Sequence, residues 1–371
     1  MIALGTIAVI AALIGLIIGA GSGAPGDPTG AEASLPAQCS GSSPAAIRRI
    51  VEGKLVVRWE GRRDQDLLRR ARAGEIGGVI LFPDISAVVE DVESEIELLQ
   101  QSATSEGGPP LIVAIDQEGG PVKRFVEEAP TRSPYDLGLS GTPADALLEG
   151  RATGNFLRKL GANVNLAPVL DVPASPDSVM SLRTFGTDPA TVERLGLAFA
   201  RGLEREDVVA TAKHFPGLGR SLLNTDLSPS EITASRLELQ RDLAPFEAAI
   251  EEDIGMVMVG IATYTTYGGE PAALSAPVIQ GLLRDRLGYR GVVITDDLGA
   301  AGVSTAYETT EAAIAAAAAG ADLLLFAGEP DPQVVPGLVW ATQRGRIDLG
   351  LLRDSCARIV ALRETLSSPG A

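Results

Sequence analysis

The sequence predicts an α/β fold in which eight parallel strands close into a (β/α)8 TIM-type barrel, and three observations support this prediction. Apolar β-type runs alternate with amphipathic helical segments from residue 55 onward. Eight such units follow one another, and parallel strands need crossovers that cover the outside of their sheet. Several strands end in polar residues, at the edge where a barrel holds its chemistry. An open doubly wound sheet is the alternative, but no Gly-x-Gly-x-x-Gly turn follows the first strand.

The predicted elements follow from hydrophobic period and from turn residues. The strands are expected at Leu55–Trp59, Gly78–Phe82, Leu111–Asp116, Val164–Asp171, Val208–His214, Met256–Ala262, Val292–Asp297 and Asp322–Phe326. Helices are expected near Asp64–Ala73, Ser86–Gln101, Pro143–Leu160, Pro189–Arg205, Thr233–Glu252, Ala276–Leu287, Glu308–Ala319 and Pro332–Arg344, with a last one near Asp348–Thr365. Together they form one domain over residues 46–371.

The first 45 residues differ in composition from the rest of the chain. Within residues 1–20, the uncharged apolar run Ile2–Ala20 is long enough to cross a bilayer, and it predicts a signal peptide or a transmembrane anchor. The sequence leaves these two alternatives open. Residues 21–45, rich in Gly, Ser, Pro and Ala, predict a flexible linker. We therefore expect an extracytoplasmic protein that is secreted or membrane-anchored, in contact with the membrane only if the N-terminal segment is retained.

Charge and cysteine content exclude some classes of partner. The formal net charge of −17 is the opposite of the basic surface that nucleic acid requires, so no nucleic-acid partner is expected. Cys39 and Cys356 lie at the two ends of the predicted domain, and in an extracytoplasmic protein an even pair predicts a disulfide. Two unpaired cysteines are the alternative. One histidine and two distant cysteines do not make a zinc set, so neither a metal nor a cofactor is expected.

The fifth predicted strand ends in Lys213 and His214, the only histidine in the chain. A buried strand has no structural use for this pair, because burying an unpaired cation costs several kcal/mol. Other predicted strands end in acidic residues, namely Asp116 with Glu118, Asp171, and Asp296 with Asp297. Because the carboxyl ends of barrel strands meet at one rim, the sequence predicts a small-molecule site rich in carboxylates there.

Five motifs along the chain resemble glycoside hydrolase family 3 in order and spacing. They are Ile115–Gly120 with Arg124, Val164–Asp171, Arg183–Gly186, Lys213–Gly217 and Val293–Leu298. The resemblance covers roughly residue 46 to the C-terminus and is closest to the single-domain β-N-acetylglucosaminidase, or β-N-acetylhexosaminidase, branch. It implies a retaining glycosidase that acts on amino-sugar glycosides such as cell-wall fragments.

The resemblance also implies roles for individual residues. Asp296 matches the family's nucleophile, a carboxylate that attacks the anomeric carbon. The positions that match sugar-binding residues are Asp116, Arg124, Arg183, Lys213 and His214. From their neighbours in the sequence, we expect Asp171 to be mainly structural, Glu118 to contact backbone or Arg124 rather than sugar, and Asp297 to cap the next helix.

The loop after His214 departs from the family pattern. The family's acid/base histidine is replaced by Asp226, its carboxylate partner by Asn224, and another loop histidine by Leu218. Asp226 is the candidate acid/base, which would require its pKa to be raised by apolar neighbours such as Leu222, Leu223 and Leu227. Two alternatives stay open: a carbohydrate-binding homologue that has lost general acid catalysis, and an enzyme that transfers the glycosyl group to phosphate or another acceptor.

Overall fold

The computed structural model describes residues 35–84 and 86–366. The apolar segment predicted over residues 1–20 lies outside the described residues, as does the predicted linker as far as residue 34. None of the helices in the described part of the chain is long and apolar enough to cross a membrane.

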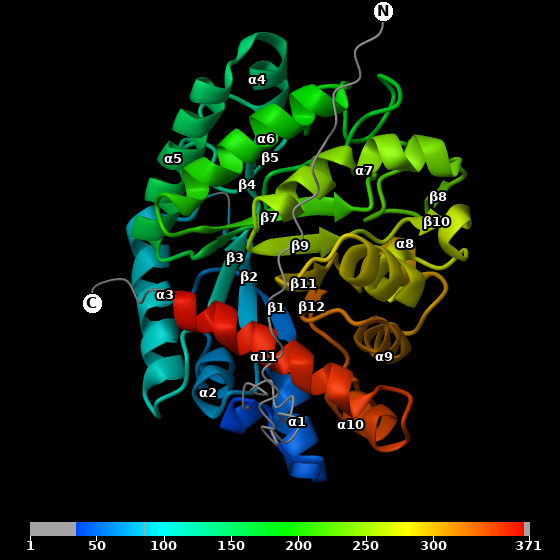
Figure 1. Cartoon of the computed structure of the whole chain (residues 1–371). Helices are drawn as coiled ribbons and strands as arrows, with labels where there is room; N and C mark the ends of the chain where they lie inside the picture. The colour runs from blue at the N-terminus through cyan, green and yellow to red at the C-terminus, as the bar shows by residue number, and fades with distance from the viewer. Residues whose placement is uncertain (1–34, 85, 367–371) are drawn as a thin grey trace, which may run out of the picture. The chain divides into compact units, whose positions relative to one another are not determined.

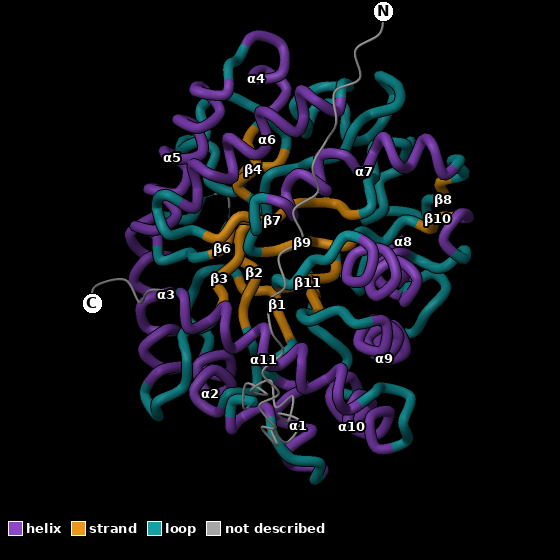
Figure 2. Tube along the Cα trace, in the orientation of Figure 1, coloured by secondary structure: helices purple, strands orange, loops and turns teal. Residues whose placement is uncertain are grey.

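Eight parallel strands form the central sheet in the order β11-β9-β7-β6-β3-β2-β1-β12. Their bounds are Leu55–Trp59 for β1, Gly78–Leu81 for β2, Ile112–Ile115 for β3, Val164–Asn165 for β6, Val209–Phe215 for β7, Met256–Val259 for β9, Val292–Thr295 for β11 and Leu324–Phe326 for β12. A parallel bridge between Ile294 and Leu323 joins the two ends of this sheet. The predicted (β/α)8 barrel is therefore confirmed, and Figure 2 shows the strands gathered at the centre with helices around them.

Each barrel strand is followed by a helix that covers the outside of the sheet (Figure 1). These are α2 Gln65–Ala73, α3 Val89–Thr104, α5 Pro143–Leu160, α6 Pro189–Glu204, α7 Arg236–Glu251, the π-helix η4 Pro277–Arg286, α9 Thr309–Ala319 and α10 Val334–Gln343. The remaining helices are η1 Ala37–Cys39, α1 Pro44–Glu52, α4 Pro134–Ser140, η2 Thr265–Tyr267, η3 Ala272–Leu274, α8 Ala301–Ser304 and α11 Leu349–Thr365. Two short ribbons, β4 Gln117–Gly119 with β5 Val122–Lys123 and β8 Glu231–Ile232 with β10 Thr263–Tyr264, lie outside the barrel sheet.

The fourth predicted strand is much shorter than expected. The ladder of β6 stops at Asn165, and only a single bridge from Val169 to Lys213 continues the predicted run to Asp171. Pro168 explains the interruption, because proline has no N–H to donate to a ladder. The chain still reaches the rim of the barrel, so that Asp171 lies beside β7.

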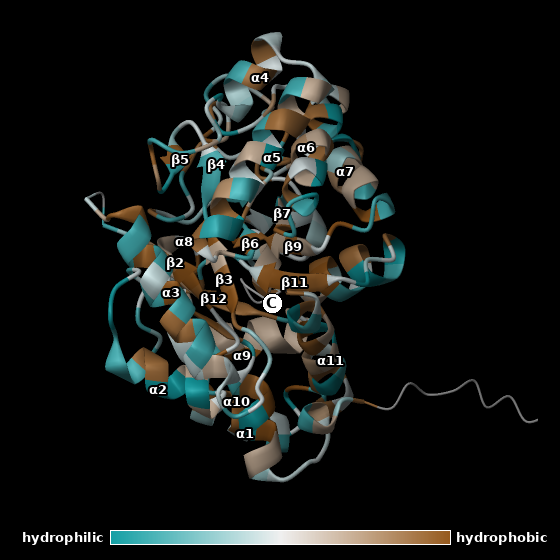
Figure 3. Cartoon of the chain, turned by 90° about the vertical axis from the view of Figure 1, so that its left-hand side faces the viewer, coloured by the Kyte–Doolittle hydropathy of each residue, from teal (hydrophilic) through white to brown (hydrophobic). Residues whose placement is uncertain are grey.

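Alternate residues of the strands fill the barrel interior. The buried cluster inside the barrel contains Val56, Ile80, Ile112, Ala114, Val164, Leu166, Met256, Met258, Val292, Ile294, Leu323 and Leu325. Figure 3 shows these strands as the apolar centre of the molecule. Because strand side chains alternate with period two, the next inward positions on four of the strands are Arg58, Phe82, Asp116 and Asp296. The apolar core thus gives way to polar groups at the C-terminal ends of the strands.

The N-terminal end of the barrel is closed by α11 and by a disulfide. Ile359 and Leu366 join the cluster inside the barrel. Cys39, at the end of η1, is bonded to Cys356 on α11. Residues 35–45, which composition predicts as linker, therefore belong to the same compact unit as the barrel. A boundary at residue 35 differs from the predicted one because the disulfide and η1 hold this segment against the last helix.

Lys54, just before β1, predicts a measurable pH dependence of stability. Its Nζ donates to the carbonyl of Ala321 and to Ser355 Oγ, and the side chain is buried. Burial lowers the pKa of Lys54 from 10.5 to about 8, although Asp322 opposes the shift. Because the folded protein binds this proton more weakly than the unfolded chain, the cost of the buried cation is fully present below about pH 8 and disappears as pH rises through about 10.5.

We expect the free energy of unfolding of the wild type, measured relative to Lys54→Met, to rise by roughly 3 kcal/mol between about pH 8 and pH 10.5, at 1.36 kcal/mol per pKa unit. Urea denaturation of both proteins across this range measures the difference, and the methionine variant cancels the titration of all other groups. A difference that does not change with pH would contradict the prediction.

Candidate active site

A pocket of about 360 Å³ opens at the C-terminal ends of the barrel strands. Its apolar lining belongs to the barrel interior near the C-terminal ends of the strands and includes Ile80, Leu166, Met258 and Leu325. All seven residues predicted as catalytic or substrate-binding line this pocket: Asp116, Arg124, Arg183, Lys213, His214, Asp226 and Asp296. The structure therefore brings together side chains that are spread over 181 positions of the sequence, from 116 to 296 counted inclusively.

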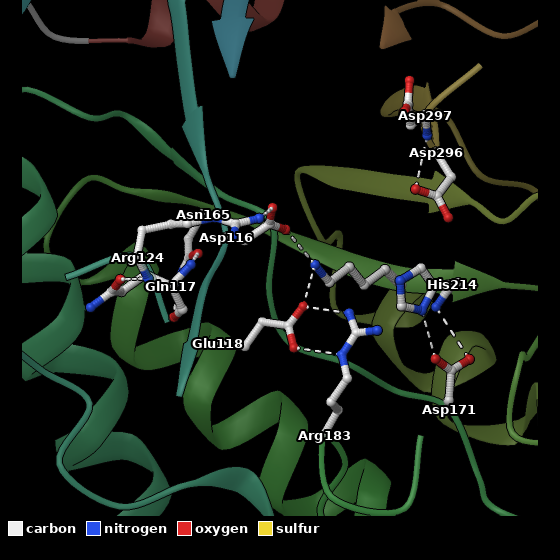
Figure 4. A network of polar contacts seen from close by, with 11 residues as sticks. Asp116, Gln117, Glu118, Arg124, Asn165, Asp171, Arg183, His214, Asp296 and Asp297 are labelled. Carbon is white, nitrogen blue, oxygen red and sulfur yellow. Dashed lines mark hydrogen bonds and ion pairs between the residues drawn. The ribbon is translucent and has the colours of Figure 1, made fainter. Parts of the chain in front are cut away.

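One side of the pocket is a network of ion pairs around Lys213. Its Nζ lies 2.8 Å from Asp116 Oδ1 and 2.5 Å from Glu118 Oε1. Asp116 Oδ2 accepts a hydrogen bond of 2.8 Å from Arg124, and Glu118 accepts two from Arg183, of 3.0 and 2.7 Å (Figure 4). A buried lysine is tolerated here because two carboxylates face it directly.

The prediction that Glu118 contacts backbone or Arg124 is wrong. Glu118 pairs with Arg183 and Lys213, whereas Arg124 pairs with Asp116. The reason is local: Gln117–Gly119 forms strand β4, along which successive side chains point to opposite sides, so that Glu118 turns to the face where Arg183 lies.

These contacts fix the ionisation of the network. Burial alone would raise the pKa of Asp116, but Lys213 and Arg124 hold it well below its usual range. The pKa of Glu118 is lowered in the same way, against its burial, by Arg183 and Lys213. Burial opposes the charge of Lys213, yet Asp116 and Glu118 raise its pKa. The network therefore stays ionised across the ordinary pH range and presents fixed donors and acceptors to the pocket.

Two buried amides hold this network in place, and sequence reasoning missed both. Asn165, at the end of β6, accepts a hydrogen bond from the backbone N–H of Gln117. The side chain of Gln117 in turn accepts from the backbone N–H groups of Arg124 and Phe125. Asn165 stands in the motif Val164–Asp171, so an amide at the end of an otherwise apolar strand was the available signal.

His214 is oriented by Asp171, from the loop after β6. His214 Nδ1 lies 2.7 Å from Asp171 Oδ2, and Asp171 Oδ1 accepts a hydrogen bond of 3.2 Å from the backbone N–H of His214 (Figure 4). The same oxygen accepts a second hydrogen bond, of 2.6 Å, from the backbone N–H of Leu218. Asp171 is fully buried and does not line the pocket. Its contacts are those of a structural residue that turns the other edge of the imidazole toward the pocket.

Asp296 follows β11 and its carboxylate lies on the opposite side of the pocket from the Lys213 network (Figure 4). Burial raises the pKa of Asp296 and nearby Asp226 raises it further, whereas His214 opposes the rise. One carboxylate oxygen accepts a hydrogen bond of 2.9 Å from the backbone N–H of Asp297. Asp296 is therefore a carboxylate held in place by backbone and largely withdrawn from solvent.

Asp297 does not cap the next helix, contrary to expectation. The helix α8 begins at Ala301 with Ala300 as its N-cap residue. Asp297 Oδ1 instead accepts hydrogen bonds of 2.9 Å from the backbone N–H groups of Gly299 and Ala327. It joins the loops that follow β11 and β12, because the chain takes a full turn between Asp297 and the first residue of α8.

Asp226 reaches the same pocket from the long loop after β7. Its backbone carbonyl accepts a hydrogen bond from the N–H of Ala301, and that of Thr225 accepts one of 2.8 Å from Gly302. A Cβ on Gly302 would lie 2.8 Å from the Thr225 oxygen, so this close approach depends on glycine. The loop that carries Asp226 is thus hydrogen-bonded to the first residues of α8, the helix that follows Asp296 in the chain.

The expected apolar environment of Asp226 is absent from the described loop. Leu222, Leu223 and Leu227 are exposed by 62%, 51% and 77%, and Asp226 is itself exposed. The hydrogen bonds from Leu227 N and Ser228 N to the carbonyl of Asn224 form a tight turn, and Leu227 points to solvent from this turn. Asp226 therefore lies at the open side of the pocket.

The whole barrel matches one family. Residues 53–362 match the model described as the glycosyl hydrolase family 3 N-terminal domain. The chain belongs to glycosyl hydrolase family 3.

Family 3 relatives extend over most of the chain. An uncharacterized secreted glycosyl hydrolase of Arthroderma benhamiae is 33% identical over 82% of this chain and 89% of its own length. Beta-hexosaminidase LpqI of Mycobacterium tuberculosis is 31% identical over 96% of this chain and 97% of its own. The structure of a family 3 β-N-acetylglucosaminidase of Paenibacillus superposes with a TM-score of 0.83 at 32% identity, over 87% of this chain and 63% of that one.

Two further residues complete the wall of this family 3 pocket and were missed from sequence. The guanidinium carbons of Arg58 and Arg124 lie 4.6 and 4.3 Å from the ring centre of Phe82. Arg58 follows Val56 by two positions, and Phe82 follows Ile80 by two positions. Because alternate strand residues point into the barrel, this spacing could have indicated from the sequence that both side chains face the pocket. Among the described residues, no group of three or more His, Cys, Asp or Glu side chains is placed to hold a metal ion.

Proposed function

We propose that the protein is a retaining β-N-acetylhexosaminidase that hydrolyses β-linked amino-sugar glycosides. The observation that carries this proposal is that Asp296 and Asp226, from two loops that are hydrogen-bonded to each other, line one pocket together with the Lys213 network. A retaining glycosidase needs this combination: a carboxylate nucleophile, a second carboxyl group as acid/base, and fixed polar groups that orient the sugar.

In the proposed mechanism, the side chains of the Lys213 network bind the hydroxyl groups of the terminal sugar. Asp296 attacks the anomeric carbon and forms a glycosyl-enzyme ester, while Asp226 gives its proton to the departing oxygen. Asp226 then accepts a proton from the water that attacks the ester, which releases the sugar, restores the carboxylate of Asp296 and returns Asp226 to its protonated form. His214 favours the ionised form of Asp296 that the first step requires.

The substrate class and location belong to the same proposal. Relatives named β-hexosaminidase and β-N-acetylglucosaminidase support an amino sugar at the non-reducing end. Cell-wall fragments are the natural substrates that we propose. A relative named as secreted and the disulfide support an extracytoplasmic location. Residues 1–20 act in this proposal as signal peptide or anchor, the chain up to residue 34 links them to the barrel, and the compact unit from Leu35 onward forms the catalytic domain.

A carbohydrate-binding homologue without catalysis is the second candidate. The observation in its favour is the exposure of Asp226, since an acid/base near neutral pH usually needs a less polar setting. Sugar binding itself requires only the Lys213 network and His214.

Hydrolysis by the full chain tests the proposal. We expect release of N-acetylglucosamine from 4-nitrophenyl N-acetyl-β-glucosaminide and from N,N′-diacetylchitobiose, with the β-anomer appearing first in the proton NMR spectrum. Appearance of the α-anomer first would contradict the retaining mechanism. No turnover of either glycoside, together with calorimetric binding of methyl 1-thio-N-acetyl-β-glucosaminide, would establish the binding protein instead.

A further inference from the structure

Arg58 differs from the other lysine and arginine side chains of the pocket in its counter-charge. The lysine and arginine residues that line the pocket are Arg58, Arg124, Arg183 and Lys213. The last three each have an oxygen of Asp116 or Glu118 within 2.8 Å. In the described part of the chain, the only carboxylate within 4.0 Å of the Arg58 guanidinium is that of Glu60, which lies 4.0 Å from Nη2. The other oxygen of Glu60 pairs with Arg62, so the charge of Arg58 is poorly neutralised.

Strand β1 directs Arg58 into the pocket. Val56, two positions earlier, lies in the apolar cluster inside the barrel, and alternate strand residues share one face. The guanidinium carbon of Arg58 lies 4.6 Å from the ring centre of Phe82, and Nη1 donates a long hydrogen bond of 3.3 Å to the carbonyl of Ala327. The side chain is 42% exposed. These contacts hold the guanidinium at the pocket wall and leave other N–H donors for a ligand.

The order of the strands places Arg58 beside the terminal sugar of the proposed reaction. In that reaction Asp296, after β11, attacks the anomeric carbon, and Asp116, after β3, binds hydroxyl groups. Strands β12, β1 and β2 lie between β11 and β3 around the closed sheet. Arg58 on β1 therefore faces one edge of a sugar ring that reaches from Asp296 to Asp116.

The charges of the pocket favour an anion at Arg58. The Lys213 network and Arg58 together hold four cations against two carboxylates, those of Asp116 and Glu118. A neutral sugar leaves this surplus of positive charge unmatched, whereas the planar fork of arginine matches a carboxylate or a phosphate. Asp226 and Asp296, where the leaving group would depart, repel an anion. The anionic group is thus expected on the terminal sugar and not on the leaving group.

We infer that Arg58 is a specificity-determining residue that binds an anionic group, a carboxylate or a phosphate, on the terminal amino sugar. This inference rests on the proposed function and adds its substrate class. The two edges of an N-acetylglucosamine ring carry such a group at different positions. A phosphate ester is placed on the hydroxyl of carbon 6, and a lactyl ether supplies a carboxylate at carbon 3. Glycosides substituted at each position therefore reveal which edge faces Arg58.

Three glycosides with one leaving group test this inference: 4-nitrophenyl N-acetyl-β-glucosaminide, its 6-phosphate and its 3-O-lactyl ether. For the wild-type full chain, we expect kcat/KM of one anionic glycoside to exceed that of the neutral glycoside by about tenfold. This is near the lower end for a hydrogen bond to a charged group, because Arg58 is partly exposed. The difference should lie mainly in KM and should shrink when sodium chloride is raised from about 20 to about 500 mM.

Variants assign the preference to Arg58. In Arg58→Met, the ratio of kcat/KM between the anionic and the neutral glycoside should fall to about one or below, and Arg58→Lys should give an intermediate ratio. Because each ratio compares two substrates of one protein, a general loss of activity cancels. Arg63→Met is the matched control and should keep the wild-type ratio, since Arg63 is 55% exposed, pairs with Glu95 and does not line the pocket.

Each outcome decides one claim. A wild-type ratio of about one or less for both anionic glycosides, or an unchanged ratio in Arg58→Met, would overturn the inference while leaving the proposed function intact. An equal fall in Arg63→Met would assign the preference to overall charge and would also overturn it. If no glycoside is cleaved, the proposed function fails, and calorimetry with the corresponding methyl 1-thio-β-glycosides tests the site alone. Tighter binding of an anionic compound that Arg58→Met abolishes supports the site, and equal dissociation constants contradict it.

Discussion

Replacing Asp296 with asparagine is expected to lower kcat by at least about 10³-fold for every glycoside, whatever its leaving group, because the amide cannot form the glycosyl-enzyme ester. The side chains are nearly equal in size, and an asparagine oxygen can still accept the hydrogen bond from Asp297 N. The pocket should therefore keep its shape. Hydrolysis of 4-nitrophenyl N-acetyl-β-glucosaminide measures the loss, with Asp285→Asn, an exposed position on η4 that does not line the pocket, as the control.

Sugar binding separates this interpretation from simple damage to the pocket. The dissociation constant of methyl 1-thio-N-acetyl-β-glucosaminide for Asp296→Asn should stay within about threefold of the wild-type value, since the Lys213 network is untouched. Activity close to that of the wild type would exclude Asp296 as the nucleophile. Loss of both activity and binding would show that Asp296 has a structural role in the pocket.

Replacing Asp226 with asparagine is expected to produce a loss that depends on the leaving group. For alkyl glycosides, which need protonation of the departing oxygen, kcat/KM should fall by about 10²- to 10⁴-fold. For the 2,4-dinitrophenyl glycoside, which departs without a proton, kcat/KM should change little. A plot of log kcat/KM against leaving-group pKa measures this, and its slope should be much steeper for the variant than for the wild type.

Added azide supplies an independent test of Asp226. Azide attacks the glycosyl-enzyme without help from a base, so it should restore turnover of the dinitrophenyl glycoside by Asp226→Asn and give a β-glycosyl azide. Asn224→Ala, which changes a neighbouring wall residue without removing a carboxyl group, is the control and should show no such rescue. Equal losses for all leaving groups, or no loss at all, would contradict the acid/base role of Asp226.

The pocket was predictable because strand ends carry its chemistry. Asp116, Lys213 and Asp296 each follow an apolar run, and closure of the sheet brings these ends to one rim. The partner of Glu118 was not predictable, because it depends on the direction in which the short strand β4 turns. The exposure of Leu227 could not be predicted either, because an apolar residue beside a candidate acid suggests a buried position. Leu227 is exposed because it lies in the turn that closes on the carbonyl of Asn224.

The bond between Cys39 and Cys356 lies at the end of the barrel opposite to the pocket. Gln38 and Cys356 line one hollow together with Gly53 and Gly108. Gly53 lies shortly before the first residue of β1, and Gly108 lies shortly before the first residue of β3. The bond is therefore at the N-terminal end of the barrel. The pocket opens at the C-terminal end, on the far side of the apolar interior.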